Sequence, residues 1–200
     1  MNALHKLVIA SHNPGKLREI NAILAPLAIS AVPQSDFNCG EADEPHGTFV
    51  ENALTKARHA SRCSGLPALA DDSGICVRAL NGAPGVNSAR YAGEPKSDAR
   101  NNQKLIEALK QQTDRRAYYY CVIVLLRHAA DPQPVIVDGS WHGEIIDQPR
   151  GEGGFGYDPY FYLPEFGKTS AELAAEEKNR ISHRGQALAK LVEILRAGKC

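Results

Sequence analysis

The chain has 200 residues, with 23 Lys plus Arg against 23 Asp plus Glu and therefore a formal net charge of zero. A hydrophobic content of 43% and a charged content of 23% are typical of a globular protein and exclude a disordered or fibrous one. The balanced charge argues against a protein that coats nucleic acid, although it leaves room for a small anionic ligand at a local site. The length suits one large domain or two small lobes that share a core.

Neither a targeting segment nor a membrane-spanning helix is expected. The apolar run at the N-terminus is too short for a signal peptide, and the longest apolar stretch, 117–126, is shorter than the ~20 residues that span a bilayer. The five cysteines form no CxxC pair, so we expect buried free thiols in a reducing cytoplasm rather than a disulfide framework or a zinc site. They are Cys39, Cys63, Cys76, Cys121 and Cys200.

In chain order, the apolar pattern first predicts a buried strand at 4–10, an amphipathic helix at 16–24 and a longer helix at 48–63. Thr48 and Glu51 fit a capping box at the start of the longer helix, and Gly65 fits its end. A strand is expected next at 68–80, broken or turned at 71–74, and then a helix at 98–110.

The second half of the chain predicts a hairpin of two long strands, at 117–128 and 135–146. A glycine-rich stretch follows at 151–156, and two helical patterns, at 170–178 and 185–197, end the chain. Helices and strands alternate without repeats or low-complexity linkers, which favours an α/β fold built on a mixed sheet.

The first segment with chemical potential is the sequence SHNPGK at 11–16, between a predicted strand and a predicted helix. Free N–H groups at the helix start, together with Lys16, would form an anion site. The segment is not a Walker A loop, because Ala10 and Leu17 stand where that motif requires Gly and Ser or Thr. The alternative is a simple turn in which Asn13 or Ser11 caps the helix.

The second group is acidic. Side chains alternate along a strand, so only one of Asp71 and Asp72 is expected to face a given pocket. A carboxylate at a strand end beside an anion site suits a magnesium ligand or a general base, whereas the alternative is an Asx turn without chemistry. Glu44 lies in a loop with no capping role, so it ranks above Glu51 as a metal ligand, since helix capping explains Glu51 equally well.

The stretch 151–156 formally matches G-x-G-x-x-G, but no helix follows it, so we reject a dinucleotide-binding loop. The remaining interpretations are a tight loop that presents Phe155 and Tyr157 as a stacking platform for a base, or a turn with a core aromatic. Further on, His183 and Arg184 lie at the start of the last predicted helix. A helix start disfavours positive charge, which indicates an anionic or acceptor-rich partner, whereas the alternative is a solvated charged face with a surface or capping histidine.

Six motifs, in order along nearly the whole chain, resemble the inosine triphosphate pyrophosphatase family of non-canonical purine nucleoside triphosphate pyrophosphatases. They are SHNPGK at 11–16, FVENALTKA at 49–57, LADDSG at 69–74, GAPGVNSARYAG at 82–93, GGFGYDP at 153–159 and EEKNRISHRGQAL at 176–188. The resemblance implies an elongated, mixed central sheet flanked by helices, with two lobes around a substrate cleft. It also implies a single catalytic domain over 1–200 and a homodimer.

The family's activity implies Mg²⁺-dependent hydrolysis of ITP, dITP and XTP to the monophosphate and pyrophosphate, which keeps deaminated purines out of DNA and RNA. By motif, Asp72 would be the general base and, with Glu44, a metal ligand. The implied substrate-binding residues are Ser11, His12, Asn13, Pro14, Gly15, Lys16, Ser73, Phe155, Gly156, Tyr157, Asp158, Lys178, His183 and Arg184.

Selectivity is expected from His183 and Arg184 as donors to the purine 6-oxygen, which adenine replaces with an amino group. The sequence does not reveal what rejects guanine. No nucleic-acid or membrane partner is expected. Two alternatives stay open: a pyrophosphatase for modified pyrimidine triphosphates, and a nucleotide-binding sensor that does not hydrolyse its ligand.

Overall fold

The computed structural model describes residues 4–198, which form two compact units. Among the described residues, unit 1 contains 4–72, Cys121–Gly139 and 184–198, whereas unit 2 contains Ser73–Tyr120 and Ser140–His183. The chain therefore passes between the units four times, and each unit is assembled from separate segments.

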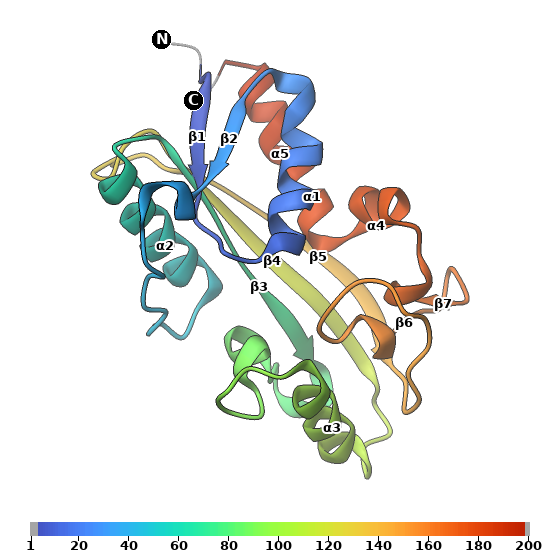
Figure 1. Ribbon diagram of the computed structural model, residues 1–200. Helices are drawn as coiled ribbons and strands as arrows, with labels where there is room; N and C mark the ends of the chain where they lie inside the picture. Colours follow the sequence, from blue (N-terminus) through green and yellow to red (C-terminus); the bar gives the residue numbers. More distant parts are fainter. Residues whose placement is uncertain (1–3, 199–200) are drawn as a thin grey trace. The chain divides into compact units, whose positions relative to one another are not determined.

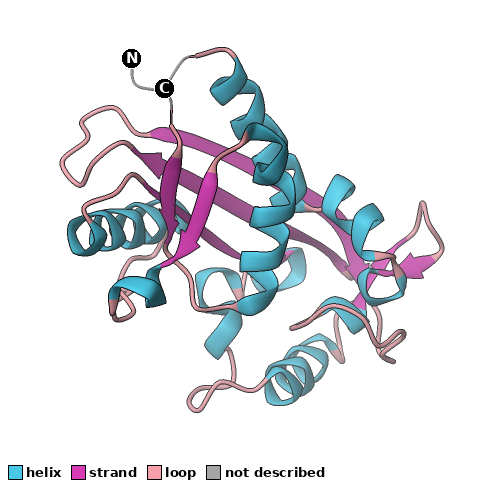
Figure 2. Ribbon diagram, turned by 45° about the horizontal axis from the view of Figure 1, so that its top comes forward, coloured by secondary structure: helices cyan, strands magenta, loops and turns pink. Residues whose placement is uncertain are grey.

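Within the described residues, seven strands form one sheet in the order β2-β1-β3-β4-β5-β6-β7 (Figures 1 and 2). Strand β1 pairs in parallel with β2 and β3, whereas β6 pairs antiparallel with β5 and β7. This mixed sheet confirms the expected fold class. The strands are β1 (Lys6–Ile9), β2 (Ser30–Pro33), β3 (Ala68–Val77), β4 (Arg116–Leu126), β5 (Val135–Ile145), β6 (Phe161–Leu163) and β7 (Lys168–Thr169).

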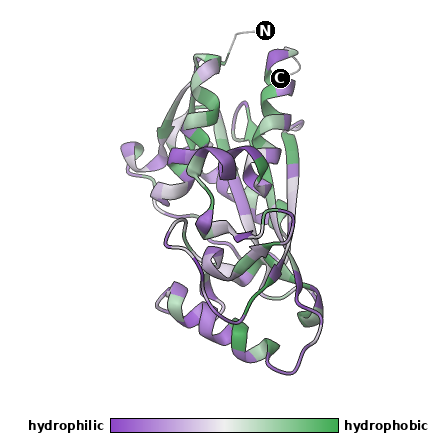
Figure 3. Cartoon of the chain, turned by 90° about the vertical axis from the view of Figure 1, so that its right-hand side faces the viewer, coloured by the Kyte–Doolittle hydropathy of each residue, from purple (hydrophilic) through white to green (hydrophobic). Residues whose placement is uncertain are grey.

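The helices carry alternating hydrophilic and hydrophobic stretches (Figure 3), as expected of elements with one buried face. No helix among residues 4–198 is long and apolar enough to cross a membrane. The α-helices are α1 (Pro14–Leu24), α2 (Phe49–Ser64), α3 (Asp98–Leu109), α4 (Ala175–Ile181) and α5 (His183–Arg196). Short 3-10 turns are η1 (Ala25–Leu27), η2 (Gln34–Phe37), η3 (Arg78–Leu80), η4 (Gly85–Arg90), η5 (Asp158–Tyr160) and η6 (Ser170–Glu172).

Helix α2 begins and ends where its sequence predicts. The Thr48 hydroxyl accepts a hydrogen bond from the Glu51 N–H at 3.3 Å and lies 2.5 Å from the Glu51 carboxylate. At the other end Gly65 adopts φ +70°, in the left-handed region that favours glycine. Glu51 therefore contacts the residue that caps its own helix, as the capping interpretation expects.

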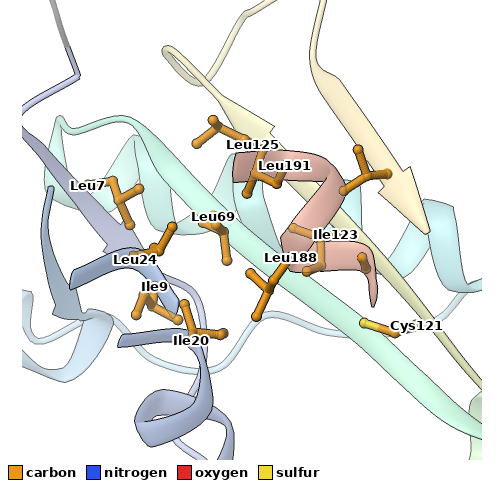
Figure 4. Close-up of a cluster of buried hydrophobic side chains, with 12 residues drawn as sticks. Leu7, Ile9, Ile20, Leu24, Leu69, Cys121, Ile123, Leu125, Leu188 and Leu191 are labelled. Atoms are coloured by element: carbon orange, nitrogen blue, oxygen red, sulfur yellow. The ribbon is translucent and has the colours of Figure 1, made fainter. Parts of the chain in front are cut away.

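The core of unit 1 forms where α1 and α5 lie side by side against one face of its strands, while α2 lies on the other side (Figure 1). Figure 4 shows Leu7 and Ile9 of β1 directed toward Leu24 of α1 and Leu188 of α5. The fully buried members of this cluster are Leu7, Ile9, Ile20, Leu24, Leu69, Cys121, Ile123, Ala187, Leu188 and Leu191.

The core of unit 2 is richer in aromatic side chains. Phe161 meets Tyr119 edge to face, with ring centroids 4.8 Å apart, and lies 5.4 Å from Trp141. Leu105 and Leu109 of α3 belong to the same cluster, so this helix is held by its apolar face.

The expected break at 71–74 in the strand predicted at 68–80 is wrong, because β3 runs without interruption from Ala68 to Val77. Within this strand Gly74 leaves room for a neighbouring segment, because a Cβ there would overlap the Gly85 carbonyl oxygen and the Ser88 hydroxyl. The predicted helix at 170–178 also differs, since a capping box between Thr169 and Glu172 forms the short turn η6 before α4 begins.

The expectation of free cysteines is also wrong for one pair, since Cys39 and Cys63 form a disulfide. Their Cα atoms lie 6.0 Å apart, although 24 positions separate them in the chain, because the segment after η2 runs beside the end of α2. Cys76 and Cys121 are free and buried, as expected. Cys200 lies outside the described residues.

We expect Cys76 and Cys121 to resist alkylation by iodoacetamide in the native protein. Burial raises the pKa of both thiols, that of Cys121 to about 12, so little thiolate is present near neutral pH. Peptide mass spectrometry after labelling checks this. Mild reduction should add label at Cys63, which is exposed, whereas native labelling at Cys121 would contradict the buried assignment.

Candidate active site

Two aspartates of β3 contact different partners, as strand alternation predicts. The buried Asp71 carboxylate lies 2.9 Å from the Lys16 ammonium and 3.3 Å from the Arg184 guanidinium. The neighbouring Asp72 carboxylate instead accepts a hydrogen bond from Lys56 at 2.8 Å. All of these side chains belong to unit 1.

Lys56 is the principal site residue that the sequence alone does not indicate. Its ammonium lies 2.7 Å from Glu44 and 2.8 Å from Asp72, so it joins the two predicted metal ligands. Burial acts to lower the pKa of Lys56, but the negative charges of Asp72, Asp71 and Glu44 outweigh it and raise that pKa. The sequence does indicate that Lys56 is partly buried, since it follows Ala53 by three positions and so lies on the alanine face of α2.

The loop that carries Glu44 is held on α2 by its neighbour His46. The buried Asn52 amide accepts from the His46 N–H and donates to the His46 carbonyl, both at 3.1 Å. The His46 ring also lies 3.1 Å from the Thr55 hydroxyl. Two residues of the FVENALTKA motif thereby fix the loop from which Glu44 reaches Lys56.

The two aspartates differ in their acidity. Burial opposes ionisation of Asp71, but the charges of Lys16 and Arg184 outweigh it and hold its pKa well below the ordinary range. For Asp72 burial is the largest effect, and Lys56 offsets it only in part, so the pKa of Asp72 is raised. Asp71 is therefore a fixed negative charge, whereas Asp72 is the better proton acceptor.

One oxygen of Asp72 is available for a further partner. Among the described residues, Oδ2 of Asp72 is buried and has no hydrogen-bond partner. No set of three or more His, Cys, Asp or Glu side chains in that part of the chain is arranged to hold a metal. Mg²⁺ commonly takes only one or two protein carboxylates and completes its shell with phosphate and water oxygens, so Glu44 and Asp72 fit that ion.

The SHNPGK loop is a capped helix start. Oδ1 of Asn13 accepts from the N–H groups of Gly15 and Lys16 at 2.8 and 3.2 Å, and Pro14 has no N–H group. The capping alternative for Asn13 is thus confirmed, and the cation that this loop contributes is Lys16. His12 accepts from Gln34 at 2.9 Å, while the Ser11 hydroxyl accepts from the Asn13 N–H.

Arg184 lies in the interior of unit 1. Its guanidinium contacts Asp71 and also the Glu19 carboxylate of α1, and its side chain is only 3% exposed. Glu19 was not anticipated, because it reads as an ordinary polar residue of an amphipathic helix. Arg184 therefore links α1, β3 and the start of α5 through two carboxylates.

In unit 2, His183 takes part in an aromatic stack. Its ring lies 4.8 Å from that of Tyr119 at an interplanar angle of 10°, and 6.5 Å from that of Trp141 at 18°. Neither Tyr119 nor Trp141 was singled out from the sequence, because aromatic residues within predicted strands read as core. The His183 imidazole is thus held flat against a neighbouring ring.

The glycine-rich loop of unit 2 is organised around Asp158. This buried carboxylate accepts from Lys178 at 2.6 Å, Ser170 at 2.8 Å and the Phe155 N–H at 2.8 Å. The Lys178 ammonium lies 5.1 Å from the centre of the Phe155 ring, which is 39% exposed. The loop thus presents an aromatic face beside a paired lysine.

The predicted site residues therefore fall into two sets. Unit 1 holds Ser11, His12, Asn13, Pro14, Gly15, Lys16, Glu44, Asp72 and Arg184. Unit 2 holds Ser73, Phe155, Gly156, Tyr157, Asp158, Lys178 and His183. The unit 1 set contains the lysine, the carboxylates and Arg184 described above, whereas the unit 2 set contains the rings of Phe155, Tyr157 and His183 beside the Lys178–Asp158 pair.

Comparison with known proteins agrees with the motifs. Residues 7–194 match the model of the Ham1 family. The chain is 71% identical over 192 residues to a dITP/XTP pyrophosphatase of Nitrosomonas europaea, covering 96% of this chain and 95% of that protein. It is 64% identical over 196 residues to a dITP/XTP pyrophosphatase of Ralstonia nicotianae, covering 96% and 98%.

Solved structures give the same result. A HAM1 protein from Coxiella burnetii matches with a TM-score of 0.91 and 51% identity, covering 96% of this chain and 98% of that one. The Staphylococcus aureus Ham1 protein matches with a TM-score of 0.85 and 41% identity, covering 98% and 100%. The family resemblance seen in the motifs is confirmed, and the chain belongs to the Ham1 family.

Proposed function

We propose that this chain, acting as one catalytic domain, hydrolyses dITP, XTP and ITP to the nucleoside monophosphate and pyrophosphate with Mg²⁺. The observation that carries the proposal is the convergence of Glu44 and Asp72 on the Lys56 ammonium, with one buried Asp72 oxygen left for a further partner. Relatives named dITP/XTP pyrophosphatase, which align over 96% of the chain, support the choice of substrates.

Glu44 and Asp72 would hold the magnesium ion, and the triphosphate would supply the remaining ligands. When bound, Mg²⁺ neutralises phosphate charge and so stabilises the departing pyrophosphate. Lys56 contributes a second positive charge at the same place, because its ammonium already lies within 2.8 Å of both carboxylates.

Asp72 acts as the general base. Oδ1 of Asp72 lies with Glu44 against the Lys56 ammonium, on the side where the two carboxylates would hold the metal, which leaves Oδ2 to accept a proton from the attacking water. The water oxygen forms a bond to the α-phosphorus, the bond from that phosphorus to the bridging oxygen breaks, and pyrophosphate leaves.

Lys16 binds the phosphates, and Asp71 with Arg184 positions it. An ammonium has three N–H donors, and Asp71 accepts from Lys16 at 2.9 Å, so further donors are left for phosphate oxygens. Arg184 acts on this lysine through their shared carboxylate, since its own side chain is buried against Asp71 and Glu19. A direct contact between Arg184 and the substrate stays a prediction.

The aromatic set of unit 2 would bind the base. The exposed Phe155 ring offers a stacking surface, and the His183 imidazole offers a donor to the purine 6-oxygen. Hypoxanthine and xanthine carry that oxygen, whereas adenine carries a donor that would leave the imidazole N–H without a partner. The remaining predicted contacts, from Ser11, His12, Ser73, Tyr157 and Lys178, are part of the proposal.

Pyrophosphate release from ITP, dITP, XTP, ATP, GTP and dUTP, measured in parallel with Mg²⁺, tests the function. We expect turnover of the first three substrates and little turnover of ATP or dUTP. Equal cleavage of ATP or dUTP would contradict the proposed selectivity and favour a broader or pyrimidine enzyme. Binding without release from any substrate would instead favour a sensor. The homodimer and the cytoplasmic location implied by the family stay predictions, and light scattering tests the first.

A further inference from the structure

We infer that Asp98 and Asn102 of α3 are positioning residues for base recognition, acting through the backbone of Gly156. This role rests on the proposed function, in which the loop at 155–158 binds the nucleobase. Neither residue has a part in the chemistry proposed above, and every contact that carries the inference lies within unit 2.

Both backbone groups of Gly156 are bound by side chains of one helix. The Gly156 N–H donates to the Asp98 carboxylate at 2.8 Å, and the Gly156 carbonyl accepts from the Asn102 amide at 2.9 Å. Asp98 and Asn102 are four positions apart, so they share one face of α3. The N–H belongs to the peptide plane shared with Phe155 and the carbonyl to the plane shared with Tyr157, so this clamp fixes both planes.

The loop at 153–158 needs such a clamp because it is rich in glycine. Gly156 has φ +64° and Gly154 has φ +76°, and glycine loses more conformational freedom on ordering than any other residue. On the other side of the loop, the Phe155 N–H is bound by Asp158, and the Tyr157 hydroxyl donates to the Ser88 carbonyl. The clamp on Gly156 completes the set of contacts that hold Phe155, the exposed ring of this loop.

Asn102 is suited to this task by its burial. The residue is 7% exposed, and the Gly156 carbonyl can only accept, so the amide must direct its NH₂ group toward it. Asn101, the adjacent residue, binds the Ala89 carbonyl and the Ala92 N–H of a different loop. Three neighbouring polar residues of one helix thus serve two loops, and only Asp98 and Asn102 serve the one proposed for the base.

The test compares Asp98→Ala with Asp98→Asn and Ser97→Ala. Asp98 is exposed, so its replacement is compatible with folding. We expect Asp98→Ala to raise KM for dITP roughly tenfold, the size of one charge-assisted hydrogen bond, with kcat nearly unchanged. Asp98→Asn keeps an oxygen acceptor for the Gly156 N–H and should restore most of the affinity. Hydrogen exchange of the 153–158 segment should accelerate in Asp98→Ala alone.

Ser97→Ala is the matched control, because it removes the α3 cap, which accepts from the Arg100 N–H, without touching Gly156. An equal rise in KM for Ser97→Ala would overturn the positioning role, since helix stability alone would then explain it. So would an unchanged KM or unchanged exchange in Asp98→Ala. Asn102→Ala provides the second variant and should show the same split between KM and kcat. Wild-type protein that releases no pyrophosphate from dITP would overturn the proposed function, and this role with it.

Discussion

Replacing Asp72 with asparagine is expected to lower kcat for dITP hydrolysis by about 10²–10⁴-fold, the usual contribution of a positioned general base. Asparagine keeps the shape of the side chain but cannot take a proton from water. The buried carboxylate has a raised pKa because of desolvation, so a neutral replacement removes that cost and should not lower the thermal midpoint. Pyrophosphate release at saturating dITP measures the loss, and calorimetric binding of dITP to the inactive variant shows that the substrate site survives.

Glu51→Gln is the matched control for this loss. Like Asp72→Asn it replaces a carboxylate with an amide, but Glu51 contacts Thr48, so the change alters only the start of α2. We expect its kcat to stay near that of the wild type. A large loss in Glu51→Gln would mean that Glu51 is a metal ligand as well as a capping residue. Retained turnover in Asp72→Asn would remove Asp72 from the base role.

Replacing Arg184 with methionine is expected to lower the free energy of unfolding by about 3–5 kcal/mol, the cost of breaking a buried ion pair from one side. The guanidinium is almost fully buried, and its loss leaves Asp71 with Lys16 and removes a partner of Glu19. For a protein of this size each kcal/mol corresponds to about 2–4 °C in the thermal midpoint. Urea titration followed by circular dichroism measures the change.

Arg184→Lys separates charge from geometry. A lysine keeps the charge, but its compact ammonium cannot engage two carboxylates as the planar guanidinium does, so an intermediate loss is expected. Arg116→Met is the surface control, since Arg116 pairs with Asp114 in an exposed position and should leave the midpoint unchanged. Equal midpoints for Arg184→Met and Arg116→Met would show that burial adds nothing to the Arg184 contacts.

The sequence was informative wherever local chemistry decides the structure. The start of α2 at Thr48 and its end at Gly65 depend on neighbours within one turn, so they were predictable. The continuity of β3 through 71–74 was not, because the aspartates there are neutralised by Lys16, Lys56 and Arg184 from distant segments. The Cys39–Cys63 bond depends in the same way on a return of the chain that no spacing reveals.

The candidate site divides along the same line. Asp72, Lys16 and Lys56 all stand in motifs of the sequence, but the pattern around Lys56 is that of a helix with an alanine face, and the role of Lys56 becomes visible only beside Glu44 and Asp72. Asn102 is a similar case, since an asparagine within a helix gives no hint that it binds a glycine 54 positions away. Such residues are found by asking which polar side chain lies on an apolar helix face.

The four crossings of the chain between its units have a consequence for biosynthesis. Unit 2 is incomplete until His183 has been made, and unit 1 needs residues from both ends of the chain. At about 5–20 residues per second, a ribosome takes roughly 10–40 s to make a chain of this length, so neither unit can close during most of that time. The apolar strand β4, synthesised midway, must wait for α5 to cover Ile123 and Leu125. Nascent chains of this protein are therefore expected to depend on chaperones, and fragments that end before α5 should aggregate rather than fold.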